Sequence, residues 1–252
     1  MDIKCQQTSY IRDGIFIADT KPTGIITANI LQLHGFPGTG KNYDLAEALA
    51  LKGYRVVVPH YQGTGQSRQG SFSFNETLKQ MAVLASHLKQ ETPNKPLYFL
   101  GYSWGGLISL INHHIADRLI LLAPLCYLPG AGPRPAKFHE SVDAYYDSPS
   151  TIARFFRSFS EGVLSHTEAD LEQEFQQLAV KLLEAKEQLK NNPKISIIHG
   201  DNDLLIPHTY SQDLLQQLGG GSLTLMKEQN HLFSHKRFDF IDSVTEVVTT
   251  TA

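Results

Sequence analysis

One serine of this chain stands in a pattern suited to nucleophilic chemistry. Ser103 is the centre of the segment GYSWG at positions 101–105. Small residues two positions before and after a serine allow a turn so sharp that larger side chains would clash, which is typical of a nucleophile elbow. A serine hydroxyl is a weak nucleophile. Such a site therefore requires a base, an acid that orients the base, and an oxyanion hole.

The later part of the chain offers an acid and a base in the order that an elbow requires. Asp203 lies in the polar loop 200–207, directly after the apolar segment 194–198, and its carboxylate could fix a histidine tautomer. Asp201 is the alternative acid, and a carboxylate that only caps a turn is a further alternative for Asp203. His231 follows the apolar segment 222–226, so we expect it to be the base. A histidine of a surface loop is the alternative, which fits His235 better.

The oxyanion hole requires two backbone N–H groups near the serine. The residue after the nucleophile, Trp104, is expected to supply one of them. The loop 34–40 (HGFPGTG) is rich in glycine and follows the apolar segment 28–33, so Phe36 is expected to supply the other. His34 would then brace this loop, although the His-Gly pair could also mark a simple turn.

These residues need elements that bring them together. Short apolar segments alternate with amphipathic ones, which predicts an α/β fold with a mostly parallel sheet and helices on both faces. The polar loops all follow predicted strands, and sites in such sheets lie beyond the carboxyl ends of the strands. The predicted strands are 3–12, 14–18, 28–33, 54–59, 96–100, 118–123, 194–198 and 222–226, and the predicted helices are 42–52, 74–90, 106–114, 208–218 and 235–248.

The alternation of strands and helices stops after the sixth predicted strand and resumes at Lys194. We therefore divide the chain into a core, 1–125 with 194–252, and a helical cap, 126–193. Within the cap we expect helices at 150–159 and 165–190, the second opened by a capping box of Ser165 and Glu168. The cap is aromatic, and its phenylalanines could instead form its own small core. The expected substrate-binding residues are Tyr102, Phe155, Phe156 and Phe159.

Composition excludes several other classes of function. The chain has 252 residues, 41% of them hydrophobic, and a net charge of −3, which gives no argument for nucleic-acid binding. Its two cysteines, Cys5 and Cys126, match no metal-ligand spacing, so we expect no metal, no cofactor and a reducing compartment. No apolar run reaches the roughly 20 residues of a membrane span, and no signal peptide is evident. We expect a cytoplasmic protein with a small-molecule acyl substrate.

The motifs together resemble those of the α/β-hydrolase superfamily, and the resemblance covers nearly the whole chain. The loop GTGQS at 63–67 and the cap after the sixth strand are similar to the monoacylglycerol-lipase and serine-aminopeptidase-like group. The resemblance also rests on HGFPG at 34–38, HGDND at 199–203 and Asn230-His231, and it implies an eight-stranded sheet.

The resemblance and the residues imply the same chemistry. We expect a serine hydrolase acting on a small or apolar carboxylic ester, with Ser103, Asp203 and His231 as a triad and an acyl-enzyme intermediate. The same machinery would serve a thioesterase, an aminopeptidase, a carbon–carbon bond hydrolase or an acyltransferase. The fold also hosts ligand-binding proteins without catalysis, a class that an intact triad disfavours.

Overall fold

The computed structural model describes residues 4–137, 140–158, 166–191 and 194–250. Its sheet has eight strands in the order β1-β2-β4-β3-β5-β6-β7-β8, with antiparallel pairs at β1–β2 and β2–β4 and parallel pairs elsewhere. The predicted α/β-hydrolase architecture is confirmed. The strands are β1 (Cys5–Arg12), β2 (Ile15–Pro22), β3 (Asn29–Leu33), β4 (Arg55–Pro59), β5 (Leu97–Tyr102), β6 (Arg118–Leu122), β7 (Ile195–Gly200) and β8 (Ser222–Met226).

Helices cover both faces of the sheet, and the five strands from β3 to β7 are buried along their whole length. One apolar layer joins the sheet to α1 and α8, and a second layer joins it to α2, α3 and α7. The helices are α1 (Tyr43–Ala50), α2 (Phe74–Glu91), α3 (Trp104–Ile111), α4 (Glu140–Asp143), α5 (Pro149–Ser158), α6 (Glu168–Gln188), α7 (His208–Leu218) and α8 (Arg237–Thr249), with short 3₁₀ turns η1 (His113–Ile115) and η2 (Ala144–Tyr146).

The strand register brings the polar loops to one edge of the sheet. Leu33 of β3 pairs with Gly101 of β5, and Leu122 of β6 pairs with Ile198 of β7. Gly200 of β7 then pairs with Met226 of β8. Because these residues stand at or near the carboxyl ends of parallel strands, the loops that follow them start beside one another.

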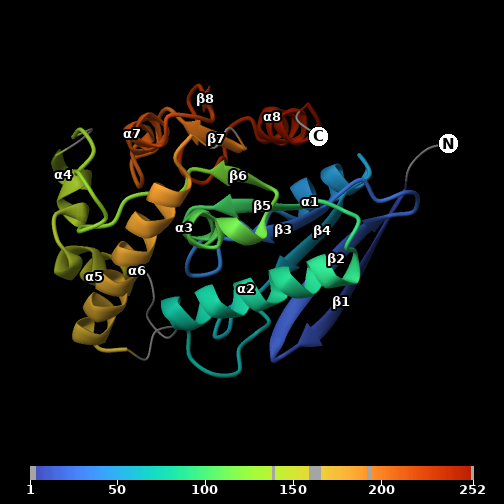
Figure 1. The fold of residues 1–252 in the computed structure, drawn as a ribbon, viewed down its shortest axis with the longest axis horizontal. Coiled ribbons are helices and arrows are strands. Elements are labelled where there is room, and N and C mark those ends of the chain that lie inside the picture. The colour runs from blue at the N-terminus through green and yellow to red at the C-terminus, as the bar shows by residue number, and fades with distance from the viewer. Residues whose placement is uncertain (1–3, 138–139, 159–165, 192–193, 251–252) are drawn as a thin grey trace.

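The elements between β6 and β7 gather at one end of the molecule. Figure 1 shows α4, α5 and α6 together there, with the β1–β2 hairpin at the opposite end. Glu174 of α6 accepts hydrogen bonds from the Ser73 hydroxyl at 2.6 Å and from the backbone N–H groups of Phe74 and Asn75 at 3.2 and 3.3 Å. These donors open α2, so a carboxylate of α6 satisfies the positive end of that helix.

The start of α6 differs from the sequence prediction. The capping box is formed by Thr167 and Asp170, whose side chains each accept a hydrogen bond from the other's backbone N–H, at 3.2 and 2.9 Å. Glu168 is the first residue of the helix, and Ser165 lies outside the described residues. The prediction of a Ser165–Glu168 box was wrong because an aspartate at the third helical position can also reach back to the cap.

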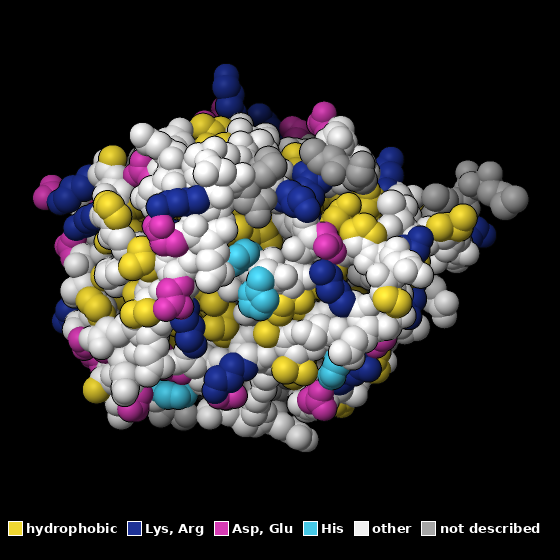
Figure 2. All heavy atoms as spheres, viewed as in Figure 1, with side chains coloured by type: hydrophobic (Ala, Val, Ile, Leu, Met, Phe, Trp, Pro, Cys, Tyr) yellow, Lys and Arg dark blue, Asp and Glu magenta, His cyan; other side chains and the backbone are white. Residues whose placement is uncertain are grey.

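The surface seen in Figure 2 carries acidic and basic side chains interspersed over the same face. This agrees with the small net charge of −3. Among the residues described, none of the helices combines the length and the apolar character needed to cross a membrane.

A substitution at Gly105 tests how closely the backbone of α3 approaches that of β3. A Cβ atom built on Gly105 would overlap the carbonyl oxygen of Leu33, which is backbone and cannot move aside. We expect Gly105→Ala to lower the free energy of unfolding by at least about 2–3 kcal/mol, measured by urea denaturation. Gly24→Ala is the matched control, since no atom lies within 4 Å of its added Cβ. Equal stability of the two variants would contradict the close approach.

Candidate active site

Ser103 occupies a strained turn between β5 and α3. Its backbone has φ 53° and ψ −115°, a conformation that non-glycine residues rarely adopt. The turn is held by hydrogen bonds: Ser103 N–H donates to Leu122 O at 2.9 Å, and Ser103 O accepts from the N–H groups of Gly106 and Leu125, both at 2.9 Å. These contacts hold the serine where its side chain stays half-buried at the carboxyl edge of the sheet.

His231 lies between Ser103 and Asp203. Its Nε2 is 3.0 Å from Ser103 Oγ, and its Nδ1 is 2.7 Å from Asp203 Oδ2. A carboxylate only accepts hydrogen bonds, so Nδ1 carries the hydrogen and Nε2 is free to accept the serine proton. The three residues that the sequence placed on three separate loops thus meet in one hydrogen-bonded row.

Asp201, the alternative acid, lies elsewhere. It is exposed, and its Oδ1 accepts a hydrogen bond from the backbone N–H of Glu228 at 2.6 Å. Asp201 therefore links the loops after β7 and β8, whereas Asp203 contacts the imidazole of His231.

Asp203 is fully buried, and hydrogen bonds surround both of its oxygens. Oδ1 accepts from the backbone N–H groups of Leu205 and Ile206, both at 2.9 Å. Burial alone would raise the pKa of Asp203, but the charge of His231 and the hydrogen bonds from His199 and His231 outweigh it and hold that pKa well below its usual range. The carboxylate is therefore ionised throughout the neutral range.

His199 is a contact of Asp203 that the sequence analysis did not single out. It lies near the end of β7 with no exposed surface, and its Nε2 is 3.1 Å from Asp203 Oδ2. The available signal was a polar ring in a mostly apolar strand, directly before the loop that carries Asp203.

The loop expected to form the oxyanion hole folds back on itself. Gly35 N–H donates to Thr39 O at 2.9 Å, and Gly38 N–H donates to Gly35 O at 3.0 Å. Within the described part of the chain, neither Phe36 N–H nor Trp104 N–H donates to a protein acceptor. Both of the N–H groups predicted for the oxyanion hole are thus available to a bound group.

His34 braces this loop from inside. Its Nδ1 is 2.7 Å from the Gly35 carbonyl, and its Nε2 is 3.4 Å from the Tyr61 N–H, so the neutral ring donates at one nitrogen and accepts at the other. The Tyr61 hydroxyl donates to His34 O at 2.7 Å. Burial, with a smaller contribution from the Lys41 charge, lowers the pKa of His34 to about 3.

The expected substrate-binding residues occupy different positions. Tyr102 is 3% exposed and packs against the His231 ring with centroids 5.3 Å apart, so it supports the base and offers little surface to a ligand. Phe156 is buried against Phe36 and Phe175, at 5.5 and 5.0 Å. The ring of Phe155 is half-buried beside Tyr145, and Phe159 lies outside the described residues.

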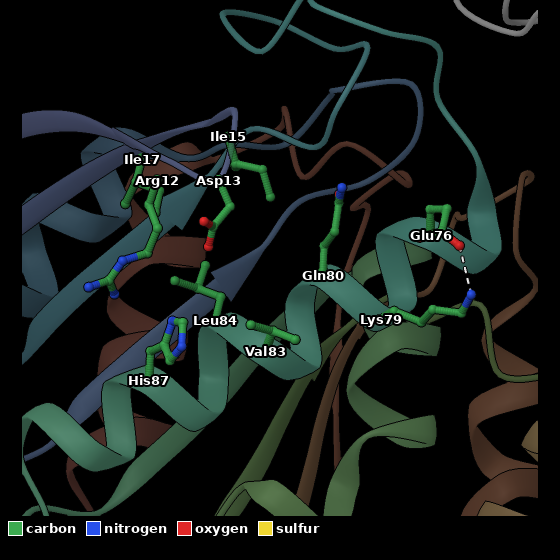
Figure 3. A pocket seen from close by; sticks show the side chains of 10 residues that line it. All are labelled: Arg12, Asp13, Ile15, Ile17, Glu76, Lys79, Gln80, Val83, Leu84 and His87. Atoms are coloured by element: carbon green, nitrogen blue, oxygen red, sulfur yellow. Dashed lines mark hydrogen bonds and ion pairs between the residues drawn. The ribbon is translucent and has the colours of Figure 1, made fainter.

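A cavity of about 290 Å³ lies away from these residues, between the β1–β2 hairpin and α2. Figure 3 shows side chains of α2 on one side of it and those of the hairpin on the other. None of the triad residues lines it, so it is separate from the candidate site. Its lining residues are Arg12, Asp13, Ile15, Ile17, Glu76, Lys79, Gln80, Val83, Leu84 and His87.

No group of three or more histidine, cysteine, aspartate or glutamate side chains is arranged to hold a metal ion within the described residues. The hydrogen-bonded part of the candidate site consists of a serine, a histidine and an aspartate.

Comparison with known proteins adds the family. The profile of the family "Serine aminopeptidase, S33" matches residues 25–235, which include the elbow, the acid loop and His231. The chain belongs to this family and to the α/β-hydrolase superfamily. No curated protein sequence matches this hydrolase at a significant level.

Solved structures share the fold at low sequence identity. Est1E from Butyrivibrio proteoclasticus, solved with ferulic acid bound, is 18% identical with a TM-score of 0.68, over 96% of this chain and 98% of its own. The esterase EaEST from Exiguobacterium antarcticum is 22% identical with a TM-score of 0.60, over 93% and 95%. XC6422 from Xanthomonas campestris, described as a serine hydrolase without a lid, is 17% identical with a TM-score of 0.64, over 98% and 94%.

The buried His34 predicts how stability depends on pH. The pKa of His34 is about 3 in the folded state and near 6.5 in the unfolded chain, so the unfolded state binds the proton first as pH falls. The contribution of His34 to the free energy of unfolding is therefore complete above about pH 6.5. About 3 kcal/mol of it is lost by pH 4. Urea unfolding at pH 7 and pH 4 measures this loss, and His34→Gln should reduce it.

His114→Gln is the matched control for His34, because the side chain of His114 is exposed. It should keep the wild-type difference between the two pH values. An unchanged difference in His34→Gln would contradict the assignment of a buried neutral imidazole to His34.

Proposed function

We propose that this α/β-hydrolase cleaves carboxylic esters through Ser103, His231 and Asp203 and an acyl-enzyme intermediate. The observation that carries the proposal is the position of His231, within 3.0 Å of Ser103 Oγ and 2.7 Å of Asp203 Oδ2. A neutral imidazole held in this tautomer can take the serine proton as the bond to the carbonyl carbon forms.

In the first half-reaction, Ser103 Oγ attacks the ester carbonyl carbon and its proton passes to His231 Nε2. The carbonyl oxygen becomes an oxyanion, which the N–H groups of Phe36 and Trp104 stabilise. The tetrahedral intermediate then breaks the bond to the leaving alkoxide, which takes the proton from His231 and departs as an alcohol. Asp203 stays ionised and stabilises the imidazolium that forms between these two steps.

In the second half-reaction, water replaces the alcohol. His231 accepts a proton from the water as its oxygen attacks the acyl carbon, and the same two N–H groups stabilise the second oxyanion. His231 then returns the proton to Ser103 Oγ as the acid is released. If an alcohol enters in place of water, the same steps transfer the acyl group to it.

The surroundings of the triad favour an apolar acyl group. Leu204 and Leu232, which directly follow Asp203 and His231, are 54% and 58% exposed. The proposal therefore takes an ester rather than an N-terminal peptide as substrate, in line with the esterases among the structural neighbours.

The segment 126–193 serves as a cap in this proposal. Its η2 residue Tyr146 donates a hydrogen bond to Leu205 O at 3.0 Å, within the loop that carries the acid. Asp143 accepts from the Tyr210 hydroxyl of α7 at 2.9 Å. The cap is thus tied to the acid loop at one end and, through Glu174, to α2 at the other, a placement suited to limiting access to Ser103.

Removal of the nucleophile tests the proposed function. Ser103→Ala should reduce kcat for p-nitrophenyl esters by about five to six orders of magnitude and abolish labelling by a fluorophosphonate, because both reactions require the serine oxygen. Folding, measured by circular dichroism, should be preserved. Ser86→Ala, which removes a half-buried hydroxyl of α2, should keep wild-type activity and labelling. Near-wild-type turnover in Ser103→Ala would refute the proposal.

Two neighbouring phenylalanines test the cap. Phe156→Ala should cost about 3–5 kcal/mol of unfolding free energy, because its ring packs between core and cap, with the preference for acyl length unchanged. Phe155→Ala, at a half-buried position, should shift the ratio of activities on short and long p-nitrophenyl esters with a smaller loss of stability. Val180→Ala, on the exposed side of α6, is the control. An unchanged ratio of these activities in Phe155→Ala would contradict a role of the cap in substrate selectivity.

A further inference from the structure

The Asp203 carboxylate receives hydrogen bonds from two histidines at the same oxygen. Oδ2 is 2.7 Å from His231 Nδ1 and 3.1 Å from His199 Nε2, while Oδ1 receives two backbone N–H groups. The mechanism uses His231 alone. A second imidazole at the same oxygen, without exposed surface, requires its own explanation.

The neighbours of His199 determine which of its nitrogens carries the hydrogen. Its Nε2 faces only acceptors, Asp203 Oδ2 at 3.1 Å and Ile206 O at 2.9 Å, so Nε2 must be the donor. Its Nδ1 is 2.8 Å from the hydroxyl of Ser211 on α7. In the neutral ring Nδ1 accepts, and Ser211 supplies the hydrogen.

A neighbour of Ser211, Cys126, fits a hydrogen bond in which Ser211 donates to His199. The Cys126 thiol lies beside Ser211, and burial raises the pKa of this thiol to about 11, so it keeps its hydrogen at neutral pH. The thiol can then donate to Ser211 Oγ while the hydroxyl donates to His199. The hydroxyl of Ser211 thereby meets the acceptor nitrogen of His199, and the His199 N–H meets Asp203 and the Ile206 carbonyl.

We propose that His199, held by Ser211, is a positioning residue for the Asp203–His231 pair. Its Nε2–H shares Oδ2 with His231 and restrains the orientation of the carboxylate. It also binds the Ile206 carbonyl, so one ring joins the acid to the loop that carries it. This inference rests on the proposed hydrolase function and names a residue that the reaction uses without contact to the substrate.

Sharing one oxygen has a chemical consequence. A hydrogen bond from His199 withdraws electron density from Oδ2 and weakens its attraction for a proton on His231. Without that bond, the His231 imidazolium would be more stable and the free base would form only at higher pH. The bond from His199 therefore favours the neutral form of His231 that acts as a base. The other titratable groups that face Asp203, His199 or Ser211 are Tyr102, Tyr146, His208 and Cys126.

Three variants test the proposal. His199→Phe keeps a planar ring and removes both nitrogens, His199→Gln keeps one N–H able to reach Oδ2, and Ser211→Ala removes the hydroxyl that holds the tautomer. The controls are His113→Phe, a half-buried histidine at the opposite edge of the sheet, and Ser196→Ala, a buried serine at the other end of β7. The measurements are the pH profile of kcat/KM for a p-nitrophenyl ester, kcat and KM separately, and the ¹H NMR resonance of His231 Nδ1–H.

In His199→Phe, the acidic limb of the profile should move to higher pH, and kcat should fall by between about 10-fold and 100-fold with little change in KM. His199→Gln should recover most of kcat, and Ser211→Ala should be intermediate. The His231 Nδ1–H resonance should move downfield in His199→Phe as its bond to Asp203 strengthens. Both controls should match wild type.

Different outcomes overturn the two proposals. If folded His199→Phe keeps the wild-type acidic limb and resonance, or if His199→Gln is no better than His199→Phe, the positioning role is wrong. If His199→Phe does not fold, the acidic limb of the pH profile in His199→Gln and Ser211→Ala decides whether His199 has the positioning role. If wild type neither hydrolyses esters nor reacts with a fluorophosphonate, the proposed function fails, and the NMR resonance alone still tests the bond from His199.

Discussion

The site depends on one buried negative charge. Asp203 has no exposed surface, and an ionised carboxylate away from water is stable only when hydrogen bonds and opposite charge replace its hydration. The protein supplies four such donors, two from the backbone of the loop 204–206 and two from imidazole rings. Each donor also fixes geometry, because a carboxylate satisfied on both oxygens cannot rotate without losing a bond.

The elements around this charge are arranged by the same requirement. His199 comes from β7 and His231 from the loop after β8, and the parallel pairing of these two strands brings both rings to the acid. On the other side of His231, the elbow presents Ser103 from the end of β5. That turn requires the backbones of α3 and β3 to touch, which only a glycine at position 105 permits.

The segment between β6 and β7 is held against the rest of the protein by a second set of contacts. A carboxylate of α6, Glu174, satisfies the first N–H groups of α2, and aromatic rings from both parts pack in one cluster. Phe156 of α5 contacts Phe36 of the oxyanion loop and Phe74 at the start of α2. The same phenylalanine whose N–H is proposed to bind the oxyanion therefore also contacts α5 with its side chain.

Local sequence determined the elements and the elbow. Alternating apolar segments gave the strand and helix positions to within a few residues at most ends, because periodicity reports burial directly. The exact start of α6 was missed, since several nearby residues can form a capping box. The Ser103 turn could be predicted because its glycines, strand and helix are all neighbours in the chain, and steric demands between neighbours leave a readable pattern.

Only the tertiary structure decided which groups contact one another across the chain. Asp201 and Asp203 are the same residue type, two positions apart in the chain. The direction in which the loop turns after β7 decides which of them contacts His231. His199, one of 11 histidines, gains significance only because β7 places its Nε2 beside Asp203 and α7 places Ser211 behind it. Tyr102 and Phe156 turned inward, since an aromatic side chain is buried wherever the surrounding elements leave space. Sequence patterns encode burial and local turns, whereas hydrogen-bond partners far apart in the chain are set by how strands and helices pack.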